Sequence, residues 1–228
     1  MITTHSHVYL ATVPMKTEFQ HIITSAILLG LFALVGVSVI AGLQVTTKDR
    51  IAANREATRL RSMNAVVGSE RYDNEILNDQ LIVQDEMFHT GGKPVTIFRA
   101  RKNGRPVAAI FDTVAPRGYS GPIYLLIGVN LDGTLSGVRV LAHTETPGLG
   151  DAIDDKHSDW ILGFEGKSLL NPDREKWGVK RDGGTFDQFT GATISPRLVV
   201  KSIRDTLDYY ASHQTDIFPS LQAEQPSD

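Results

Sequence analysis

The stretch Val95–Leu141 reads VTIFRARKNGRPVAAIFDTVAPRGYSGPIYLLIGVNLDGTLSGVRVL, and its pattern decides the fold of the C-terminal part of the chain. Runs rich in β-branched and aromatic residues occur at Val95–Arg101, Val107–Val114, Ile123–Val129 and Thr134–Leu141. Asn103-Gly104 separates the first two runs, and Asp132-Gly133 separates the last two. Both pairs are typical of hairpin turns in which the two central residues need positive φ. We therefore predict an α+β fold with a mainly antiparallel sheet, not a parallel dinucleotide-binding sheet.

Flanking helices are predicted after these strands. Asp154–Phe164 has the composition of a short helix whose core-facing side carries Trp160, Ile161 and Phe164. In Pro196–His213, apolar residues recur at helical spacing on one face, namely Val199, Ile203, Leu207 and Tyr210. Ser195 is a favourable N-cap and Pro196 a favourable first helical residue. This face should pack on the sheet.

A membrane anchor is predicted near the start of the chain. No Lys, Arg, Asp or Glu occurs between Phe19 and Thr47, and the apolar segment is Ile22–Leu43. A helix over that segment would be roughly 33 Å long, enough for a hydrocarbon core of about 30 Å. A cleaved signal peptide would have a shorter apolar region after a basic start, and a buried core helix is less consistent with this length. We expect an uncleaved span at 22–43, preceded by a short segment at 1–21 and followed by a polar, solvated connecting helix at 44–70.

The basic residues near the span bear on its orientation. Lys16 precedes the span, whereas the residues that follow it include Lys48, Arg50, Arg55, Arg59 and Arg61. Because cytoplasmic flanks carry the excess of Lys and Arg, this count places the large C-terminal part in the cytoplasm.

Composition excludes several classes of function. Hydrophobic residues make up 41% and charged residues 21%, as in ordinary globular proteins, and the formal net charge of −3 argues against nucleic-acid binding. The absence of Cys excludes disulfide scaffolds, thiolate zinc sites, iron–sulfur clusters and thiol nucleophiles. No glycine-rich dinucleotide fingerprint follows a strand, and no phosphate-binding P-loop motif is present.

Two stretches differ from ordinary scaffold. The first, His143–Gly150, reads HTETPGLG, and its glycines permit close approach of the backbone to a ligand, although a simple turn is favoured on composition alone. His143 and Glu145 are too few to indicate a metal site.

The second stretch, Asp187–Pro196, reads DQFTGATISP and places the hydroxyls of Thr190 and Thr193 just before a predicted helix. Free amides and the helix dipole favour an anion such as a phosphate there, and Arg197 adds a possible charge partner. A capped helix with incidental threonines is the alternative interpretation.

Together the two stretches resemble the FMN-binding domain family. GYSGPIYLLIGVNLDGT at Gly118–Thr134 and WGVKRDGG at Trp177–Gly184 make the sequence similar to the G subunits of Rnf/Rsx ion-translocating electron transport complexes. The resemblance covers about Arg71–Tyr210 and the anchor. The C subunit of the sodium-pumping NADH:quinone reductase shares both motifs and is the nearest alternative. The resemblance implies an FMN-binding domain at 71–218 and a flexible tail at 219–228.

The resemblance also implies a site. FMN would be joined covalently, through a phosphoester, to Thr193, by a flavin transferase that uses FAD and magnesium. Thr193 would then be an attachment point, with no catalytic or metal-binding residue in the chain. The family often has Ser at the position of Thr190. The other implied cofactor-binding residues are Glu145, Thr146, Gly148, Leu149, Gly150, Thr190, Gly191, Ala192, Ile194 and Ser195.

The implied role is that of a flavoprotein subunit relaying electrons between other membrane and peripheral subunits of an Rnf/Rsx complex. Such a complex couples electron transfer between NADH and ferredoxin-like carriers to ion transport, and this chain would have no independent turnover. The family places the flavin domain on the periplasmic side of the bacterial inner membrane, as a single-pass protein in the lipid bilayer, against the Lys/Arg count. A flavin-free, membrane-anchored adaptor is the alternative from another class. A hydrolase is poorly supported because Ser120 does not lie in a GxSxG elbow.

Overall fold

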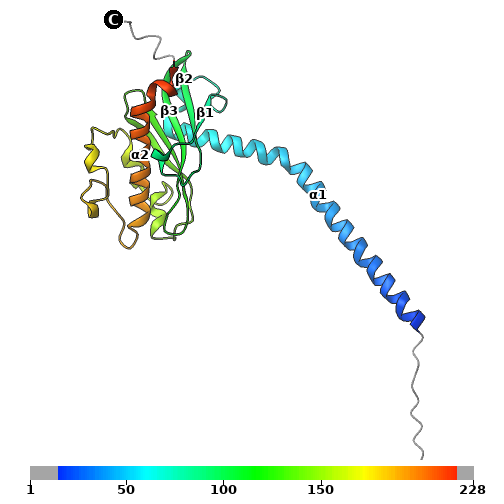
Figure 1. Cartoon of the computed structure of the whole chain (residues 1–228). Helices are drawn as coiled ribbons and strands as arrows, with labels where there is room; N and C mark the ends of the chain where they lie inside the picture. Colours follow the sequence, from blue (N-terminus) through cyan, green and yellow to red (C-terminus); the bar gives the residue numbers. More distant parts are fainter. Residues whose placement is uncertain (1–14, 220–228) are drawn as a thin grey trace, which may run out of the picture. The chain divides into compact units, whose positions relative to one another are not determined.

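The computed structural model describes residues 15–219, which divide into two compact units between Glu56 and Ala57. The predicted segment 1–21 and the predicted tail 219–228 lie largely outside these residues. Helix α1 (Met15–Val67) contributes to both units, and the second unit contains the sheet and helix α2 (Ile194–Ile217) (Figure 1).

The sheet is an antiparallel meander with the strand order β1-β2-β3-β4-β5, which confirms the predicted α+β fold. The four predicted strands are present, each within two residues of its predicted ends, as β2 (Val95–Lys102), β3 (Arg105–Ala115), β4 (Ile123–Asn130) and β5 (Leu135–Ala142). The edge strand β1 (Gln80–Val83) was not predicted.

The two hairpin turns differ in conformation. Asn103 and Gly104 both have positive φ, 52° and 75°, as the sequence predicts. In the β4–β5 turn only Gly133 does, with φ of 81°, so the prediction of positive φ at Asp132 was wrong. The amide of Gly133 donates to the carbonyl of Asn130 (3.0 Å). This turn therefore needs a left-handed backbone conformation only at its glycine. The carboxylate of Asp132 instead accepts from the amide (3.0 Å) and hydroxyl (2.7 Å) of Thr134.

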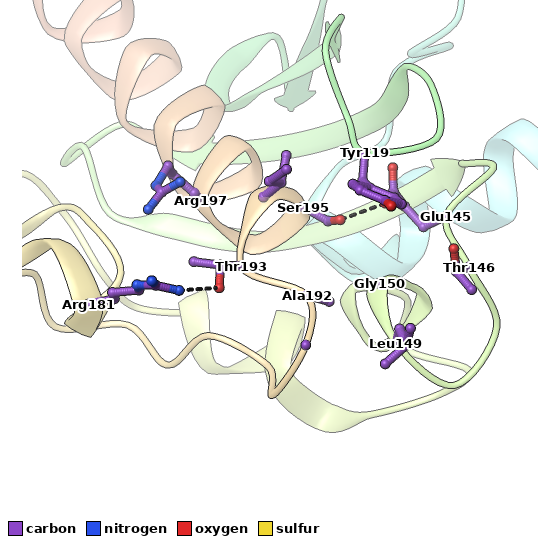
Figure 2. Close-up of a pocket in the computed structure, with 12 residues that line it drawn as sticks. Tyr119, Glu145, Thr146, Leu149, Gly150, Arg181, Ala192, Thr193, Ser195 and Arg197 are labelled. Carbon is purple, nitrogen blue, oxygen red and sulfur yellow. Dashed lines mark hydrogen bonds between the residues drawn. The ribbon is translucent and has the colours of Figure 1, made fainter.

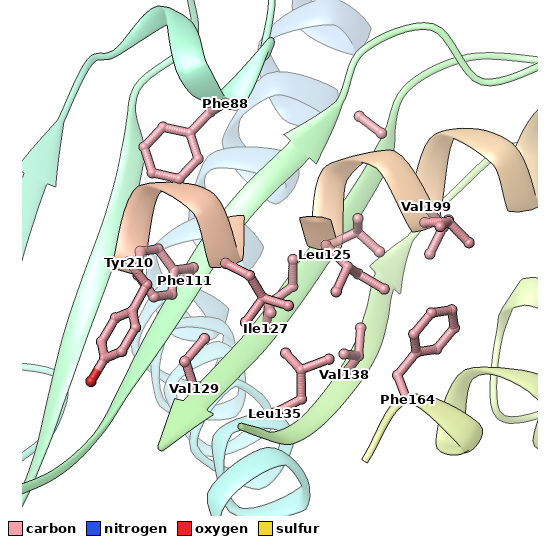
Figure 3. Packing of buried hydrophobic residues seen from close by; sticks show 14 of the residues in the cluster. Phe88, Phe111, Leu125, Ile127, Val129, Leu135, Val138, Phe164, Val199 and Tyr210 are labelled. Carbon is pink, nitrogen blue, oxygen red and sulfur yellow. The ribbon is translucent and has the colours of Figure 1, made fainter. Parts of the chain in front are cut away.

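Helix α2 covers one face of the sheet and completes the larger hydrophobic core (Figure 3). The residues predicted to form its inner face are all buried, namely Val199, Ile203, Leu207 and Tyr210. They pack on alternate residues of the central strands, including Phe111, Leu125 and Ile127. The burial of this stripe fixes the helix across the sheet and thereby the position of the helix's first turn.

Asp154–Phe164 is not the single short helix that its composition predicts. One 3₁₀ segment, Gly150–Ile153, ends just before this range, and another, Asp159–Phe164, forms only its second half. The carboxylate of Asp154 accepts from the amide of Lys156 (3.1 Å), and the hydroxyl of Ser158 accepts from the amide of Trp160 (3.2 Å). These side-chain acceptors start new turns and thus interrupt a continuous helix. Ile161 and Phe164 are buried, and Trp160 packs against this core from its edge.

The last turns of α1 cover the opposite face of the sheet. Met63, Val66 and Val67 are at most 3% exposed and pack in a second cluster with residues such as Phe98 and Leu126. The sequence instead predicted a solvated helix here. Charged residues dominate the composition of this stretch, and its few apolar residues at helical spacing were not recognised as a buried face.

Glycines in the sheet allow this close approach. A Cβ on Gly128 would lie 2.4 Å from Cγ1 of Val66, and one on Gly137 would lie 2.9 Å from the Val66 carbonyl. Arg59 adds an ion pair to Asp112 (2.5 Å). The helix ends at Val67 and is followed by Gly68, whose φ of 84° is a conformation that favours glycine.

The N-terminal unit contains the apolar part of α1. Within Gln20–Lys48, the most apolar window of 18 residues has a mean hydropathy of 2.6 and no buried residue. The predicted span 22–43 lies inside this range. Its length and composition are sufficient for a membrane crossing.

Candidate functional site

A cavity of about 610 Å³ lies at the first turn of α2 (Figure 2). Three segments far apart in the sequence form most of its wall: the β3–β4 connection at Tyr119, the loop after β5, and the residues immediately before α2. Arg181 and Arg197 complete the lining. The two stretches singled out in the sequence therefore meet in one cavity.

Most residues implied by the sequence resemblance line this cavity, namely Glu145, Thr146, Leu149, Gly150, Gly191, Ala192, Thr193, Ile194 and Ser195. Gly148 and Thr190 do not line it. Gly148 has φ of 75° and turns the loop after β5, whereas Thr190 is exposed. Of the two, only Gly148 has a backbone conformation that shapes the loop.

The buried carboxylate of Glu145 joins the three segments. Its side chain is 4% exposed, and its Oε2 accepts from the hydroxyl of Ser195 at 2.6 Å (Figure 2). Its Oε1 accepts from the amide of Ser120 at 3.3 Å. The amide of Glu145 donates to Nδ1 of His143 at 3.1 Å. Because buried carboxylates are costly without donors, these contacts hold the loops against the helix.

Two glycines make room for this carboxylate. A Cβ on Gly118 would lie 2.5 Å from Oε1 of Glu145, and one on Gly150 would lie 2.8 Å from Oε2. Neither glycine has a positive φ in the left-handed region, so the requirement is space rather than backbone conformation.

Ser195 is not the N-cap that the sequence predicts. The helix begins at Ile194, and Thr193 takes the capping position with φ of −84° and no side-chain cap. Ser195 therefore lies inside the first turn, where its hydroxyl binds Glu145 instead of a helix amide. Pro196 is also within the first turn, where a missing N–H removes no helical hydrogen bond.

The turn before the helix presents Thr193 to the cavity. Gly191 has φ of 81°, and the amide of Ala192 donates to the carbonyl of Phe189 at 3.1 Å. The Phe189 ring packs 5.3 Å from Trp160, whose Nε1 donates to the carbonyl of Asp187 at 3.0 Å. Trp160 thus anchors the segment that leads to Thr193, in addition to its place at the edge of the core.

Two arginines differ in how their charges are balanced. Arg197, the predicted charge partner, makes two hydrogen bonds to the carboxylate of Asp182, at 2.5 and 2.8 Å. These bonds, with a smaller effect of the nearby Arg181 charge, lower the pKa of Asp182. Within residues 15–219, no carboxylate forms an ion pair with Arg181. Its Nη1 lies 3.5 Å from Oγ1 of Thr193, the limit of a hydrogen bond (Figure 2).

Apolar side chains are unusually exposed at the cavity. Tyr119 is 71% exposed, Leu149 43% and Ile194 41%. Sequence reasoning missed Tyr119 and Arg181, although both lie in stretches quoted for the family resemblance. The sequence offered two signals: an aromatic residue in the Gly-Tyr-Ser-Gly stretch, and a second basic residue before the Gly183-Gly184 pair.

Comparison with known proteins first gives the class. The model of the FMN-binding domain matches residues 118–208, and that of the RnfG N-terminal region matches residues 15–66. The second unit therefore contains an FMN-binding domain, whose match covers the cavity residues from Tyr119 to Arg197.

Curated relatives then give the particular family. The G subunit of the ion-translocating oxidoreductase complex of Pseudoalteromonas atlantica is 43% identical over 199 residues, covering 87% of this chain and 93% of the relative. The Pseudomonas aeruginosa protein of that name is 45% identical over 204 residues, covering 90% and 95%. The Shewanella loihica protein is 40% identical over 195 residues, covering 86% and 92%. The chain belongs to the family of G subunits of ion-translocating oxidoreductase complexes, which confirms the predicted resemblance.

The cavity fits the cofactor of this class. A hydroxyl, a guanidinium and the first turn of a helix suit a phosphate, and the exposed apolar side chains suit an aromatic ring system. Among the described residues, no group of three His, Cys, Asp or Glu is placed to hold a metal ion. The chemistry of this site is therefore that of an FMN-binding electron-transport subunit, and its apolar helix indicates attachment to a membrane.

Proposed function

We propose that FMN is attached covalently to Thr193 through its phosphate. The observation that carries this proposal is the position of the Thr193 hydroxyl, which lines the cavity at the first turn of α2. In the attachment step, Oγ1 of Thr193 forms a bond to the phosphorus on the FMN side of FAD. The diphosphate bond of FAD breaks, AMP leaves, and the hydroxyl proton is released. No oxidation or reduction is involved, and a separate flavin transferase with magnesium performs the step.

The chain's own residues hold and surround the cofactor. Amides of the first turn of α2 face the phosphate, since they have no partners within the helix. Tyr119, Leu149 and Ile194 offer the apolar surface for the ring system. The Glu145–Ser195 hydrogen bond keeps the cavity walls together. Bound FMN supplies the redox chemistry, while the protein supplies position and electrostatics.

The proposed cofactor-binding set remains the one implied by the sequence, with Gly148 acting through its loop. Thr193 is the attachment point, and no catalytic residue or metal ligand is proposed.

The chain relays electrons between other membrane and peripheral subunits of its complex. The complex as a whole couples electron transfer between NADH and ferredoxin-like carriers to ion transport. The chain has no independent turnover, which agrees with the absence of a dinucleotide-binding motif in its sequence. The curated relatives, named as subunits of ion-translocating oxidoreductase complexes, support this assignment.

We also propose a single-pass protein of the bacterial inner membrane. Residues 1–21 form a short cytoplasmic segment, residues 22–43 cross the bilayer, and residues 44–70 connect to the flavin domain at 71–218 on the periplasmic side. The burial of Met63 and Val66 supports grouping the end of that connector with the flavin domain. A reporter fused to the C-terminus tests the orientation, and a signal from the cytoplasm alone contradicts it.

Flavin attachment is tested on denatured protein from a host that contains the flavin transferase. We expect a fluorescent band on the gel and an FMN-sized mass addition on the peptide that contains Thr193. Thr193→Val, which removes the oxygen and keeps the shape, should give a dark, folded protein. Thr185→Val, a change of the same kind at an exposed threonine outside the cavity, should remain fluorescent. A dark wild-type band beside a fluorescent flavinylated standard supports the flavin-free adaptor instead.

A further inference from the structure

We infer that Arg181 is the positioning residue for the phosphoryl group at Thr193, both while the ester forms and afterwards. This inference rests on the proposed attachment of FMN to Thr193. It assigns a role to a side chain that the sequence motifs alone do not single out.

The distance between the two side chains is the first observation. Nη1 of Arg181 lies 3.5 Å from Oγ1 of Thr193, and both residues line the same cavity. A phosphoryl group bonded to that oxygen would enter the space beside the guanidinium. Arginine presents a planar fork of donors that matches the geometry of phosphate oxygens, and such charged hydrogen bonds are strong.

The second observation is the balance of charge around the cavity. Lys180 pairs with Asp187 at 2.6 Å, and Arg197 pairs with Asp182 at 2.5 Å. Among the basic residues of this region within 15–219, Arg181 has no ion-pair partner. A phosphodiester carries a single negative charge, which a guanidinium without an ion-pair contact can balance.

The backbone around Arg181 is held in place, so the side chain starts from a fixed point. The amide of Arg181 donates to Oε1 of Gln188 at 3.2 Å, and the amide of Lys180 donates to the carbonyl of Phe186 at 2.7 Å. The Phe186 ring stacks 4.6 Å from Phe164 in the core. Both ends of the segment between Lys180 and Gln188 are therefore anchored, which limits the loss of entropy on binding.

The test measures the initial rate of flavin attachment to the full-length chain in detergent, with purified flavin transferase, FAD and magnesium. We expect Arg181→Gln to lower this rate about tenfold, because one charge-assisted hydrogen bond is lost. Arg181→Lys should recover part of the rate, since it restores the charge without the fork. The matched control is Lys180→Gln, which removes the same charge from the adjacent residue outside the cavity and should change the rate less than twofold.

A second readout separates contact with the phosphate from recognition by the transferase. The ³¹P resonance of the attached phosphodiester should shift in the fraction of Arg181→Gln that becomes loaded, and should match wild type in Lys180→Gln. The inference is overturned by a wild-type rate in Arg181→Gln, by equal losses in both variants, or by an unchanged ³¹P resonance. If wild-type protein itself gains no flavin on Thr193, the proposed attachment fails, which the mass of the peptide shows directly.

Discussion

Removing the hydroxyl of Ser195 should destabilise the protein strongly although the change is one atom. Ser195 is 1% exposed and Glu145 4%, and their oxygens are 2.6 Å apart. Ser195→Ala leaves Oε2 of a buried carboxylate without this donor. The loss of a hydrogen bond to a charged, buried group costs about 1.5–3 kcal/mol. For a domain of this size, that loss lowers the unfolding midpoint by about 3–12 °C.

The assay is thermal and urea unfolding of the full chain in detergent, followed by tryptophan fluorescence. The control is Ser212→Ala on the same helix, where an exposed hydroxyl donates to the carbonyl of Asp208 (3.0 Å) and the expected cost is below about 0.5 kcal/mol. A double-mutant cycle with Glu145→Gln should give a coupling energy of roughly 1 kcal/mol or more. If Ser195→Ala is no more destabilising than Ser212→Ala, the carboxylate does not hold the cavity walls together.

Three other perturbations test the packing and the charges. Gly128→Ala should cost about 1–3 kcal/mol in unfolding free energy, because its Cβ would lie 2.4 Å from a methyl group of α1, whereas Gly163→Ala, with nothing within 4 Å, should cost less. Trp160→Phe removes the indole donor to the main chain before the Thr-Gly-Ala-Thr turn and should cost about 1 kcal/mol by urea unfolding, with no loss expected if the bond is unimportant. Arg197 lowers the folded pKa of Asp182, so this pair stabilises the fold above the unfolded Asp pKa of about 3.9, and the stabilisation disappears as the pH falls through the folded value. The difference in urea midpoint between wild type and Arg197→Gln should therefore shrink from pH 6 to pH 3, and a constant difference would contradict the pairing.

Local rules predict the regular part of this fold well. The Asn103-Gly104 turn and the alternating strands are recognisable from the residues within them. The inner face of α2 is predicted by the helical spacing of its apolar residues. Strand β1 was missed because it is only four residues long, and one of its three apolar side chains, Ile82, is 64% exposed. Its pairing comes from the neighbouring β2, so its own composition gives little signal.

The sequence predicted which loops form the site, but it did not predict all the charged residues and polar contacts there. The Thr-Gly-Ala-Thr turn and the loop after β5 were singled out from their glycines, their hydroxyls and the predicted helix start, and the resemblance then implied their roles. Arg181 was missed because its approach to Thr193 depends on the irregular chain path between the short 3₁₀ segment Lys180–Asp182 and helix α2. The role of Ser195 was misassigned because a hydroxyl before Pro is a good cap by local rules, while the acceptor it uses lies 50 residues away. Long-range partners of polar side chains are not visible in local sequence patterns.

The last turns of α1, the helix that also contains the apolar segment, cover one face of the sheet, and this determines where the protein can be truncated. A soluble fragment that began at residue 71 would lack Met63, Val66 and Val67. The faces of Phe98 and Leu126 that these residues cover would then meet water. Exposed apolar patches of this kind promote aggregation. A fragment that starts at Ala57, where the second compact unit begins, keeps the helical residues that cover this face of the sheet. It is therefore the better starting point for crystallisation or NMR.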